Sequence, residues 1–544
     1  MALIEVTGLV FRYAGATSDA LAGLDLTVDE GEFVAVVGAN GSGKSTLARL
    51  LGGLARPAAA LEAAVCGHDL LTDDGHQAVR RDVGVLFQNP DNQLVGATVE
   101  EDLAFGLENL ALPPHDIAQR VDETLAEFDL IDLRHREPHL LSGGQKQRTA
   151  LAGVLAIPRR VLVLDEPTAM LDPAGRDEVL EAVRRAAAGG LTVVLITQEM
   201  DEVVPADRVV ALAAGRRVFD GRPAGLFADG ALVRDLSLGL PPAAEIGAGL
   251  VARGVVSRLP LSLDELMAAL PTPTTARTAP GQAAAFAPAL APASASALAP
   301  AAPDTPAPGA PSPPAAAPEG DGIGLTCRDV SFWYDEGAAG VEALRDVDLT
   351  VGAGERLALL GPTGSGKSTL LQLLRGLLAP DRGEVLIDRL AAADPGYLER
   401  QRRVGLVFQT PELQLFASTC RDDVAFGPRQ LGWDQERVGR AVERALTTVG
   451  LPADRFGARH PYSLSGGEQR RLALAGVLAM EPAVLLLDEP FVSLDPASRG
   501  ELDVVLRRLV AAGMGLVLAT HDVDRAYALC DRRVVLDAGR VVDA

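Results

Sequence analysis

Short apolar runs alternate with helix-like stretches along most of the chain. The runs "EFVAVVG", "VLVLDE" and "TVVLIT" cover residues 32–38, 161–166 and 192–197. A second set, "RLALLG", "VLLLDE" and "LVLAT", covers residues 356–361, 484–489 and 516–520. β-Branched and aliphatic runs of this length between helical segments are typical of parallel strands in an α/β layer fold. The pattern therefore predicts an α/β fold, and it predicts that fold twice.

The two sets of runs are related by a nearly constant spacing, which we call the repeat spacing. The distance in sequence from Lys44 to Lys367 defines this spacing. The distance from Gln88 to Gln409 is slightly shorter. Such self-similarity indicates a tandem repeat of one domain. With 544 residues the chain is too long for a single hydrophobic core, so two large domains agree with the length as well.

The segment 271–320 separates the repeats and differs from them in composition. Most of its residues are Ala or Pro. Frequent Pro disfavours a helix, and little bulky apolar surface is available to bury, so we expect an extended, disordered linker. Residues 240–270 before it indicate two short helices split by Leu-Pro. The expected organisation is a first domain over 1–240, a short helical extension over 241–270, the linker over 271–320 and a second domain over 321–544.

Charge, cysteine usage and hydropathy disfavour several classes of protein. The formal net charge of −23 gives a surface that repels phosphate backbones, so we expect no nucleic-acid partner. The four cysteines are far apart in the sequence, which indicates neither a disulfide framework nor a zinc site. Because the sequence has no long apolar stretch and no signal-peptide pattern, we expect a cytoplasmic chain that reaches a membrane only through partners.

Two glycine-rich loops follow apolar strands and lead into helical sequence. They read "GANGSGKST" over 38–46 and "GPTGSGKST" over 361–369. Such P-loops bind a nucleotide because their backbone N–H groups face a β-phosphate, the lysine neutralises phosphate charge and the serine hydroxyl contacts Mg²⁺. A glycine-rich turn with a chance lysine is the alternative, but two loops in register disfavour it. The candidate ATP-binding residues are Gly38, Asn40, Gly41, Gly43, Lys44, Ser45 and Thr46, and Gly361, Thr363, Gly364, Gly366, Lys367, Ser368 and Thr369.

An Asp-Glu pair ends one buried run in each repeat. Asp165 and Asp488 are expected to hold Mg²⁺ through water, and the following Glu166 and Glu489 to polarise the attacking water. A strand that merely ends in an acidic turn is the alternative. It does not account for a P-loop at a matching distance in both repeats.

A third motif combines serine with two glycines at a predicted helix start. It reads "LSGGQKQR" over 141–148 and "LSGGEQRR" over 464–471, an arrangement that favours an anion. A simple helix cap would need the serine alone. The candidate residues are Ser142, Gly143 and Gly144, and Ser465, Gly466 and Gly467.

The order of P-loop, glutamine loop, LSGGQ-like signature, Asp-Glu pair and switch residue resembles the ABC ATPases over nearly all of both repeats. The resemblance implies two P-loop NTPase domains, each with a RecA-like core, an antiparallel β subdomain and a helical signature subdomain. It further implies an intrachain head-to-tail pairing in which the P-loop of one half and the signature of the other enclose each MgATP.

The same resemblance assigns further site residues. Tyr13 and Tyr334 match the aromatic residue that stacks on adenine, with packing in the core as the alternative. Asp172 and Asp495 match the D-loop aspartates. Gln88 and Gln409 match the glutamine that reaches the Mg²⁺ or the attacking water. The implied metal-binding set is therefore Ser45, Gln88 and Asp165 in the first half, and Ser368, Gln409 and Asp488 in the second.

The switch position differs between the halves. His521 in "LATHDVD" matches the switch histidine of the family, and Gln198 in "LITQEMD" precedes it by the repeat spacing. A glutamine can donate a hydrogen bond to a γ-phosphate but cannot become an imidazolium, so we expect two unequal ATP sites. The alternative is that Gln198 serves equally well because Glu166 is retained.

The sequence after the first glutamine, "QNPDNQLVGATVEEDLAFGLEN", resembles the ATPases of energy-coupling factor (ECF) transporters. The resemblance implies a short helix that meets the coupling helices of an integral membrane T-component, in a groove lined by Asp91, Asn92 and Gln93. Glu412 and Gln414 take comparable positions in the second half, so the grooves would not be interchangeable. A solvated polar turn is the alternative. Residues 259–270 also resemble the C-terminal segment of such ATPases, which helps the halves associate.

Together these features predict an ATPase on the cytoplasmic face of the membrane. It would energise an ECF-type importer of a vitamin, a vitamin precursor, or cobalt or nickel ions, and the cargo would bind a separate membrane S-component. The alternatives are a fused ATPase of another ABC importer class and, less favoured by the Ala/Pro linker and negative charge, a soluble tandem ABC translation factor.

Overall fold

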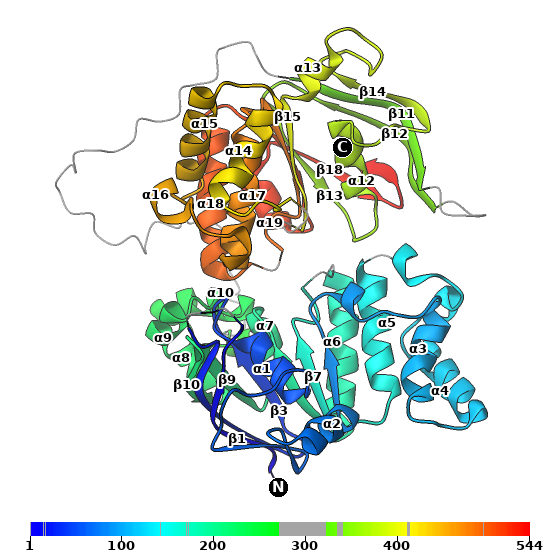
Figure 1. Cartoon of the computed structure of the whole chain (residues 1–544), viewed down its shortest axis with the longest axis vertical. Helices are drawn as coiled ribbons and strands as arrows, with labels where there is room; N and C mark the ends of the chain where they lie inside the picture. Colours follow the sequence, from blue (N-terminus) through cyan, green and yellow to red (C-terminus); the bar gives the residue numbers. More distant parts are fainter. Residues whose placement is uncertain are drawn as a thin grey trace, which may run out of the picture.

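The computed structural model describes residues 2–14, 16, 18–141, 143–169, 171, 173–270, 323–334, 341–410, 414–492 and 494–543. The predicted linker 271–320 therefore lies outside the described residues. The first half, coloured blue to green in Figure 1, lies below the second half, coloured yellow-green to red.

The first half contains two sheets. One has the order β2-β1-β4-β5 and is antiparallel, with strands β1 (Ala2–Phe11), β2 (Leu21–Asp29), β4 (Glu62–Val65) and β5 (His68–Asp69). The other has the order β10-β9-β3-β8-β7-β6, with strands β3 (Phe33–Val37), β6 (Val83–Leu86), β7 (Val161–Asp165), β8 (Thr192–Ile196), β9 (Arg208–Ala213) and β10 (Arg216–Gly221). All pairs in this second sheet are parallel except β9 with β10.

The second half repeats this plan. Its antiparallel sheet has the order β12-β11-β14, with β11 (Leu325–Tyr334), β12 (Val341–Val351) and β14 (Arg382–Ile387). Its mainly parallel sheet has the order β15-β16-β17-β13-β18-β19, with β13 (Arg356–Leu360), β15 (Val404–Val407), β16 (Val484–Asp488), β17 (Gly515–Ala519), β18 (Arg532–Asp537) and β19 (Arg540–Asp543). The predicted α/β class is confirmed, and all six predicted apolar runs contain parallel strands.

The helices of the first half are α1 (Lys44–Leu51), α2 (Asp73–Asp82), α3 (Val99–Glu108), α4 (Pro114–Glu127), α5 (Gly143–Ala156), α6 (Pro173–Ala188), α7 (Met200–Val203), α8 (Pro223–Ala228), α9 (Gly230–Asp235), α10 (Pro242–Ala252) and α11 (Leu263–Ala269). Those of the second half are α12 (Lys367–Arg375), α13 (Tyr397–Gln401), α14 (Cys420–Gln430), α15 (Gln435–Thr448), α16 (Ala453–Phe456), α17 (Gly466–Leu478), α18 (Pro496–Ala511) and α19 (Val523–Leu529). Helices α3–α5 and α14–α17 each form a helical group beside the parallel sheet (Figure 1). Within the described ranges, no helix combines the length and the apolar character needed to cross a membrane.

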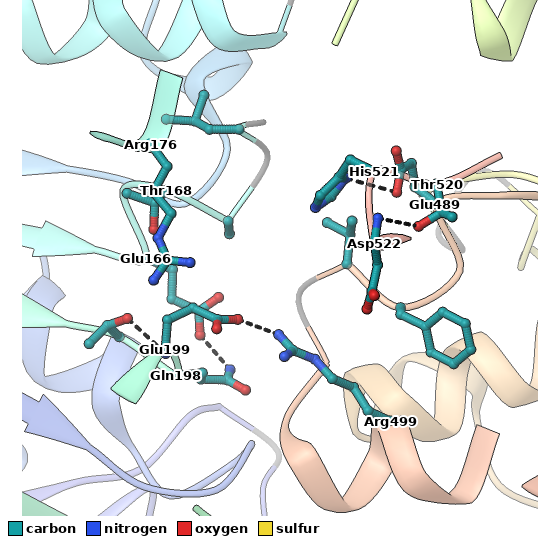
Figure 2. Close-up of a pocket in the computed structure, with 15 residues that line it drawn as sticks. Glu166, Thr168, Arg176, Gln198, Glu199, Glu489, Arg499, Thr520, His521 and Asp522 are labelled. Carbon is teal, nitrogen blue, oxygen red and sulfur yellow. Dashed lines mark hydrogen bonds and ion pairs between the residues drawn. The ribbon is translucent and has the colours of Figure 1, made fainter. Parts of the chain in front are cut away.

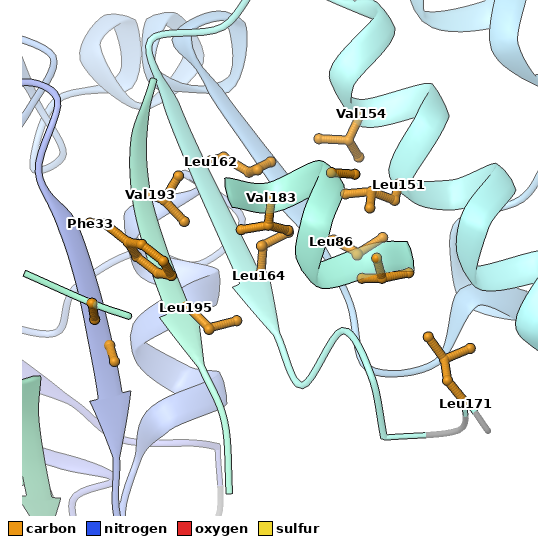
Figure 3. Close-up of a cluster of buried hydrophobic side chains, with 14 of the residues drawn as sticks. Phe33, Leu86, Leu151, Val154, Leu162, Leu164, Leu171, Val183, Val193 and Leu195 are labelled. Atoms are coloured by element: carbon orange, nitrogen blue, oxygen red, sulfur yellow. The ribbon is translucent and has the colours of Figure 1, made fainter. Parts of the chain in front are cut away.

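Both faces of the central strands β3, β7 and β8 are covered, which explains why these strands are almost entirely apolar. Phe33 on β3 belongs to a buried cluster on one face that extends to Leu162 and Leu164 of β7 and to Leu151 of α5 (Figure 3). Val34, the next residue of β3, packs on the other face with Leu47 of α1. Successive side chains of a strand point to opposite faces, so a strand buried on both sides has no place for a polar residue.

The last helices of the first half lie next to the second half. Helices α10 and α11 occupy the tail 240–270, and Leu259-Pro260 lies between them, as the sequence indicates. Ala244 of α10 is fully buried in the core of its own half. A Cβ atom on Gly239, just before α10, would lie 3.8 Å from Cγ of Pro496 in the second half.

Two side chains hold the loop that follows Gln88, and two equivalent side chains hold the loop that follows Gln409. The first of these side chains is a second glutamine, Gln93 or Gln414. The Gln93 amide accepts from the N–H of Phe87 and donates to the carbonyl of Val85, at 3.1 and 2.8 Å. Gln414 bonds Phe408 and Leu406 in the same way, at 3.1 Å each. Both amides therefore satisfy peptide groups at the end of a strand, and contact of Gln93 and Gln414 with a partner groove stays a prediction. Glu412 lies outside the described residues.

The second side chain that holds this loop is an aspartate shortly before each "AFG", Asp102 or Asp423. One Asp102 oxygen accepts from the N–H groups of Val95 and Gly96, at 2.6 and 2.8 Å. In the second half Asp423 accepts from Phe416 and Ala417, at 2.9 and 2.8 Å. The repeated Gln and Asp thus make matching contacts in both halves.

We predict that Asp423→Ala loosens the second loop locally. Removing an acceptor of two backbone N–H groups costs about 1–3 kcal/mol, so the amides of Phe416 and Ala417 should exchange hydrogen roughly tenfold faster or more. Hydrogen exchange measured by mass spectrometry on the whole chain checks this. Asp422→Ala is the matched control, because the half-exposed Asp422 bonds Arg429 and the Thr419 hydroxyl and not the two loop amides. Equal exchange in both variants would contradict the role of Asp423.

Candidate nucleotide-binding sites

Each P-loop turns into its helix at a glycine whose conformation and surroundings exclude a side chain. Gly43 before α1 has φ 104° and Gly366 before α12 has φ 101°, both in the left-handed region. A Cβ on Gly43 would lie 2.5 Å from the carbonyl oxygen of Ala20, and one on Gly366 would lie 2.6 Å from that of Ala343. The loops can therefore approach the preceding strand only because these positions lack a side chain.

The two P-loop lysines are buried and curl over their own loops. Lys44 Nζ donates to the carbonyl oxygens of Gly38 and Ala39, at 2.7 and 3.0 Å. Lys367 Nζ does the same to Gly361 and Pro362, at 2.7 and 2.9 Å. Burial lowers the pKa of Lys44, and the carboxylates of Glu166 and Asp165 oppose that effect. The chain has only three lysines, and two of them occupy these P-loop positions.

The residues expected to hold Mg²⁺ form a suitable set of oxygen donors. Ser45 Oγ lies 3.2 Å from Asp165 Oδ1 in the first half. Among the described residues, buried Oδ1 of Asp488 has no hydrogen-bond partner, and burial raises the pKa of this carboxyl to about 6. An orphaned carboxylate oxygen beside the Ser368 hydroxyl fits a hard cation. Ser45, Gln88 and Asp165, and Ser368, Gln409 and Asp488, are the side chains that would hold it.

In the first half a glutamate carboxylate gathers two amides. Gln88 Nε2 donates to Glu166 Oε2 at 2.8 Å, and Gln198 Nε2 donates to Glu166 Oε1 at 2.5 Å. Gln198 also donates to Oδ1 of Asn40 in the P-loop at 2.7 Å. Burial raises the pKa of Glu166 to about 7, although Lys44 and Gln198 oppose the rise. The amide of Gln198 thus connects the candidate base, shown in Figure 2, with the phosphate-binding loop.

In the second half the equivalent glutamate pairs with a histidine. His521 Nδ1 lies 3.1 Å from Glu489 Oε2, and Lys367 Nζ lies 4.0 Å from Glu489 Oε1. The hydrogen bond to Glu489 raises the pKa of His521. This centre can therefore carry a positive charge at a position where the first centre has the neutral Gln198. At the repeat spacing, Asn40 is matched by Thr363.

Both glutamates have a strained backbone. Glu166 has φ 49° and Glu489 has φ 44°. A non-glycine residue with such a φ costs about 1–3 kcal/mol and persists only where its surroundings require it, often at functional sites. The same strain at the same position of both repeats is an observation independent of the sequence motif.

The second P-loop opens onto a cavity shared with the signature region of the first half. Tyr334, Thr363, Gly364, Gly366, Lys367, Ser368, Thr369, Gln409, Glu489 and His521 line it from the second half, and Arg136, Leu140, Leu141 and Gln145 from the first half. Gln145 directly follows the serine-glycine motif, whereas Ser142 itself lies outside the described residues. In Figure 1, α5 lies on the same side of the molecule as α12.

One charge of the second half acts on the first P-loop lysine. The carboxylate of Asp495 is among the charges that act on Lys44. Asp495 also caps α18 by accepting from the N–H of Ser498 at 2.8 Å. Ser465 caps α17 together with Glu468. The matching aspartate, Asp172, lies outside the described residues.

The two candidate adenine-stacking tyrosines occupy equivalent positions. Tyr13 OH lies 3.1 Å from Thr46 Oγ1, and Tyr334 OH lies 3.2 Å from Thr369 Oγ1. The Tyr13 side chain is 43% exposed, which argues against the alternative of a core tyrosine. Each ring packs edge-to-face on a phenylalanine two residues earlier.

Arg136 is a lining residue that the sequence motifs did not predict. It precedes the signature by several residues, and only the fold brings it to the second P-loop. The signal available was its match to Arg459 at the repeat spacing.

Comparisons with known proteins agree with this geometry. A family model described as ABC transporter matches residues 21–169 and 344–492. A protein of Bifidobacterium longum, named "Putative ABC transporter ATP-binding protein BL0043", is 36% identical over 551 residues, which is 96% of this chain and 64% of that protein. This chain thus spans 64% of that relative's length. A similarly named protein of Streptomyces avermitilis is 39% identical over 553 residues, covering 99% and 93% of the two chains.

Solved structures align with part of the chain. The structure of cbiO1 from Clostridium perfringens, described as part of the ABC transporter complex cbiONQ, is 34% identical with a TM-score of 0.40, and covers 46% of this chain and 98% of that one. A dimeric cassette, MJ0796 bound to ADP and Pi, is 30% identical with a TM-score of 0.37, and covers 40% and 96%.

We predict that each P-loop lysine supports one of two binding events. Lys44→Ala and Lys367→Ala should each weaken one Mg²⁺-dependent binding event of a non-hydrolysable ATP analogue roughly tenfold or more, because a charge-assisted contact is lost. Isothermal titration calorimetry on the full chain checks this. Arg56→Ala, at an exposed position after α1, is the control. A lysine variant that keeps both events at full affinity would contradict the assignment of that loop.

Proposed function

The chain belongs to the ABC transporter family of ATP-binding proteins, and from this premise we propose that it is the fused ATPase of an ECF-type importer. Its two ABC ATPase domains use ATP with Mg²⁺. In the proposed complex the chain lies on the cytoplasmic face of the membrane and binds an integral membrane T-component, while a separate S-component binds the micronutrient. The observation that carries the proposal is the pair of equivalent loops after Gln88 and Gln409, each with an exposed apolar patch.

The apolar patches lie where the family resemblance implies contact with a membrane partner. In the second half Phe416 and Phe426 are 62% and 45% exposed, and their rings meet edge-to-face with centroids 4.8 Å apart. Val95 and Phe105 take the matching positions in the first half and are 64% and 51% exposed. Exposed aromatic side chains beside a rigid loop are typical of protein-binding surfaces. Two copies fit a membrane partner that presents two coupling segments.

The two patches differ, which suggests a partner with two unlike segments. The first patch combines Val95 with Phe105 and lies near Asp91, which is 61% exposed and accepts from Lys146 at 2.7 Å. The second patch is made of two phenylalanines. A segment that suits an apolar surface beside a carboxylate need not suit a purely aromatic one, so each half would select its own coupling segment.

Hydrolysis at the second centre uses residues whose positions suit water attack. Glu489 is the candidate base, and the adjacent His521 can stabilise charge on the γ-phosphate as a cation. Lys367 neutralises phosphate charge from the other side. Mg²⁺, when bound, would further neutralise the β- and γ-phosphates. In the first centre Gln198 supplies a hydrogen bond without charge, so we propose that the first site turns over more slowly.

We predict unequal effects of the two glutamates on turnover. Glu489→Gln should lower kcat by roughly 10²–10⁴, the contribution of a general base, whereas Glu166→Gln should lower it by less than about tenfold. Steady-state ATPase assays check this, with nucleotide binding measured in both variants to show that the sites still load. A Glu489→Gln variant with nearly wild-type kcat would contradict the proposed inequality.

We predict that the second patch is needed for membrane association. Phe416→Asp should reduce the amount of the chain that sediments with its host's membranes by roughly tenfold, because a buried charge at an interface costs several kcal/mol. Leu398→Asp, at a position 66% exposed on α13, is the control. Co-purified proteins identify the partner class: T- and S-components support the ECF proposal, paired permeases indicate another importer class, and ribosomal proteins indicate a translation factor.

A further inference from the structure

One ion pair joins the two halves next to the first switch residue. Glu199 directly follows Gln198, and Arg499 lies in the first turn of α18 in the second half. Arg499 Nη2 donates to Glu199 Oε1, a contact between residues 300 positions apart (Figure 2). The side chains of Arg499 and Glu199 are 27% and 34% exposed. Burial opposes ionisation of Glu199, but the charge and hydrogen bond of Arg499 lower its pKa overall.

The residues that match this pair at the repeat spacing are also charged, but they do not bond each other in the structure. At the repeat spacing, Arg176 matches Arg499 and Asp522 matches Glu199. Arg176 instead donates to Glu202 Oε1 at 2.9 Å and to Asp201 Oδ1 at 2.6 Å, both within the first half. Asp522 caps α19 and pairs with Arg525 at 2.8 Å. Among the described residues, the inter-half pair is therefore present on one side only.

A single charge reversal explains this difference. At the repeat spacing, Glu202 is matched by Arg525. The Glu202 side chain is fully buried, and it accepts from the hydroxyls of Thr168 and Thr197 as well as from Arg176. Arg525 instead stacks over Phe491, with 4.2 Å from its guanidinium carbon to the ring centroid. An arginine at this position repels Arg499, whereas the glutamate attracts Arg176.

Arg499 is consequently directed across the boundary. Among the described residues, the structure gives Arg499 no ion pair within its own half, and its Nε has no hydrogen-bond partner. Both guanidinium groups, Arg176 and Arg499, line one cavity between the halves together with Glu166, Glu489, Gln198 and His521. The ion pair of Arg499 with Glu199 therefore lies between the two candidate catalytic centres.

We propose that the Arg499–Glu199 pair is a one-sided latch through which the second half positions Gln198 in the first ATP site. His521 is held by the charge of Glu489. The side chain of Gln198 donates to Glu166 and Asn40, and the ion pair of the adjacent Glu199 holds the backbone that carries Gln198. Arg499 is a positioning residue that acts through Glu199. This inference rests on the proposed roles of Gln198 and Glu166, and it is independent of the membrane partner.

The alternative is an interface ion pair without effect on the site. Exposed pairs contribute about 0–1 kcal/mol and leave neighbouring geometry unchanged. The two interpretations differ in which switch segment becomes less ordered when Arg499 is lost. A latch changes only the first switch segment, residues 197–203, whereas a general contact between the halves loosens both switch segments.

Hydrogen exchange on the full chain tests the latch. Arg499→Gln should accelerate exchange in residues 197–203 by about fivefold, the loss of roughly 1 kcal/mol, and leave residues 520–526 unchanged. Arg525→Glu should accelerate exchange in residues 197–203 to the same extent, because the new carboxylate recaptures Arg499 within its own half. Arg507→Gln is the matched control, since Arg507 is on α18 and makes a surface pair with Asp503. Equal acceleration in 520–526, or none in 197–203, would overturn the proposal.

Nucleotide discrimination tests the positioning role. In a Lys367→Ala background, where the first site dominates binding, Arg499→Gln should reduce the preference for a non-hydrolysable ATP analogue over ADP by about fivefold, because Gln198 no longer meets the γ-phosphate. The charge-swapped pair Glu199→Arg with Arg499→Glu should restore both preference and exchange to within about twofold. An unrestored swap, or an unchanged preference, would overturn it. Neither assay uses a membrane partner, so failure of the ECF proposal would leave these results interpretable.

Discussion

The arrangement of each half depends on a buried carboxylate placed at the end of a parallel strand. Glu166 and Glu489 follow strands buried on both faces, and each has a backbone conformation that costs energy. A charge in such a place needs partners, because the surrounding protein cannot solvate it as water does. Gln88 and Gln198 donate to Glu166 in the first half, and His521 and Lys367 lie beside Glu489 in the second, so the carboxylate organises the site as much as it serves the chemistry.

The two halves answer this requirement differently. The second half supplies His521, whose charge state Glu489 can favour directly. The first half supplies two neutral amides, and the pKa of Glu166 is raised to about 7 by burial. A duplicated fold can tolerate this divergence because the strands and loops that carry the residues are fixed independently, by the covered sheet and by braces such as Asp102 and Asp423.

The sequence predicted what depends on local pattern. The six apolar runs became parallel strands because a sheet covered on both faces excludes polar residues from them. The glycines, lysines and Asp-Glu pairs come together because the parallel strands β3 and β7, like β13 and β16, lie on either side of one further strand and end at the same edge of the sheet. The direction of Gln93 was not predictable, since it depends on which peptide groups remain unpaired where β6 ends. Arg136 and Arg499 act across the halves, a relation that no single repeat contains.

One signal for that relation was nevertheless present in the alignment of the repeats. Glu202 and Arg525 differ in the sign of their charge at a position that is fully buried in the first half and partly buried in the second. Such a reversal cannot be neutral to a matching arginine nearby: it retains Arg176 in one half and sends Arg499 into the other. The half with the neutral switch residue is thus the half that receives a charged contact from its neighbour. The asymmetry at the switch and the asymmetry at the interface are parts of the same departure from two-fold symmetry.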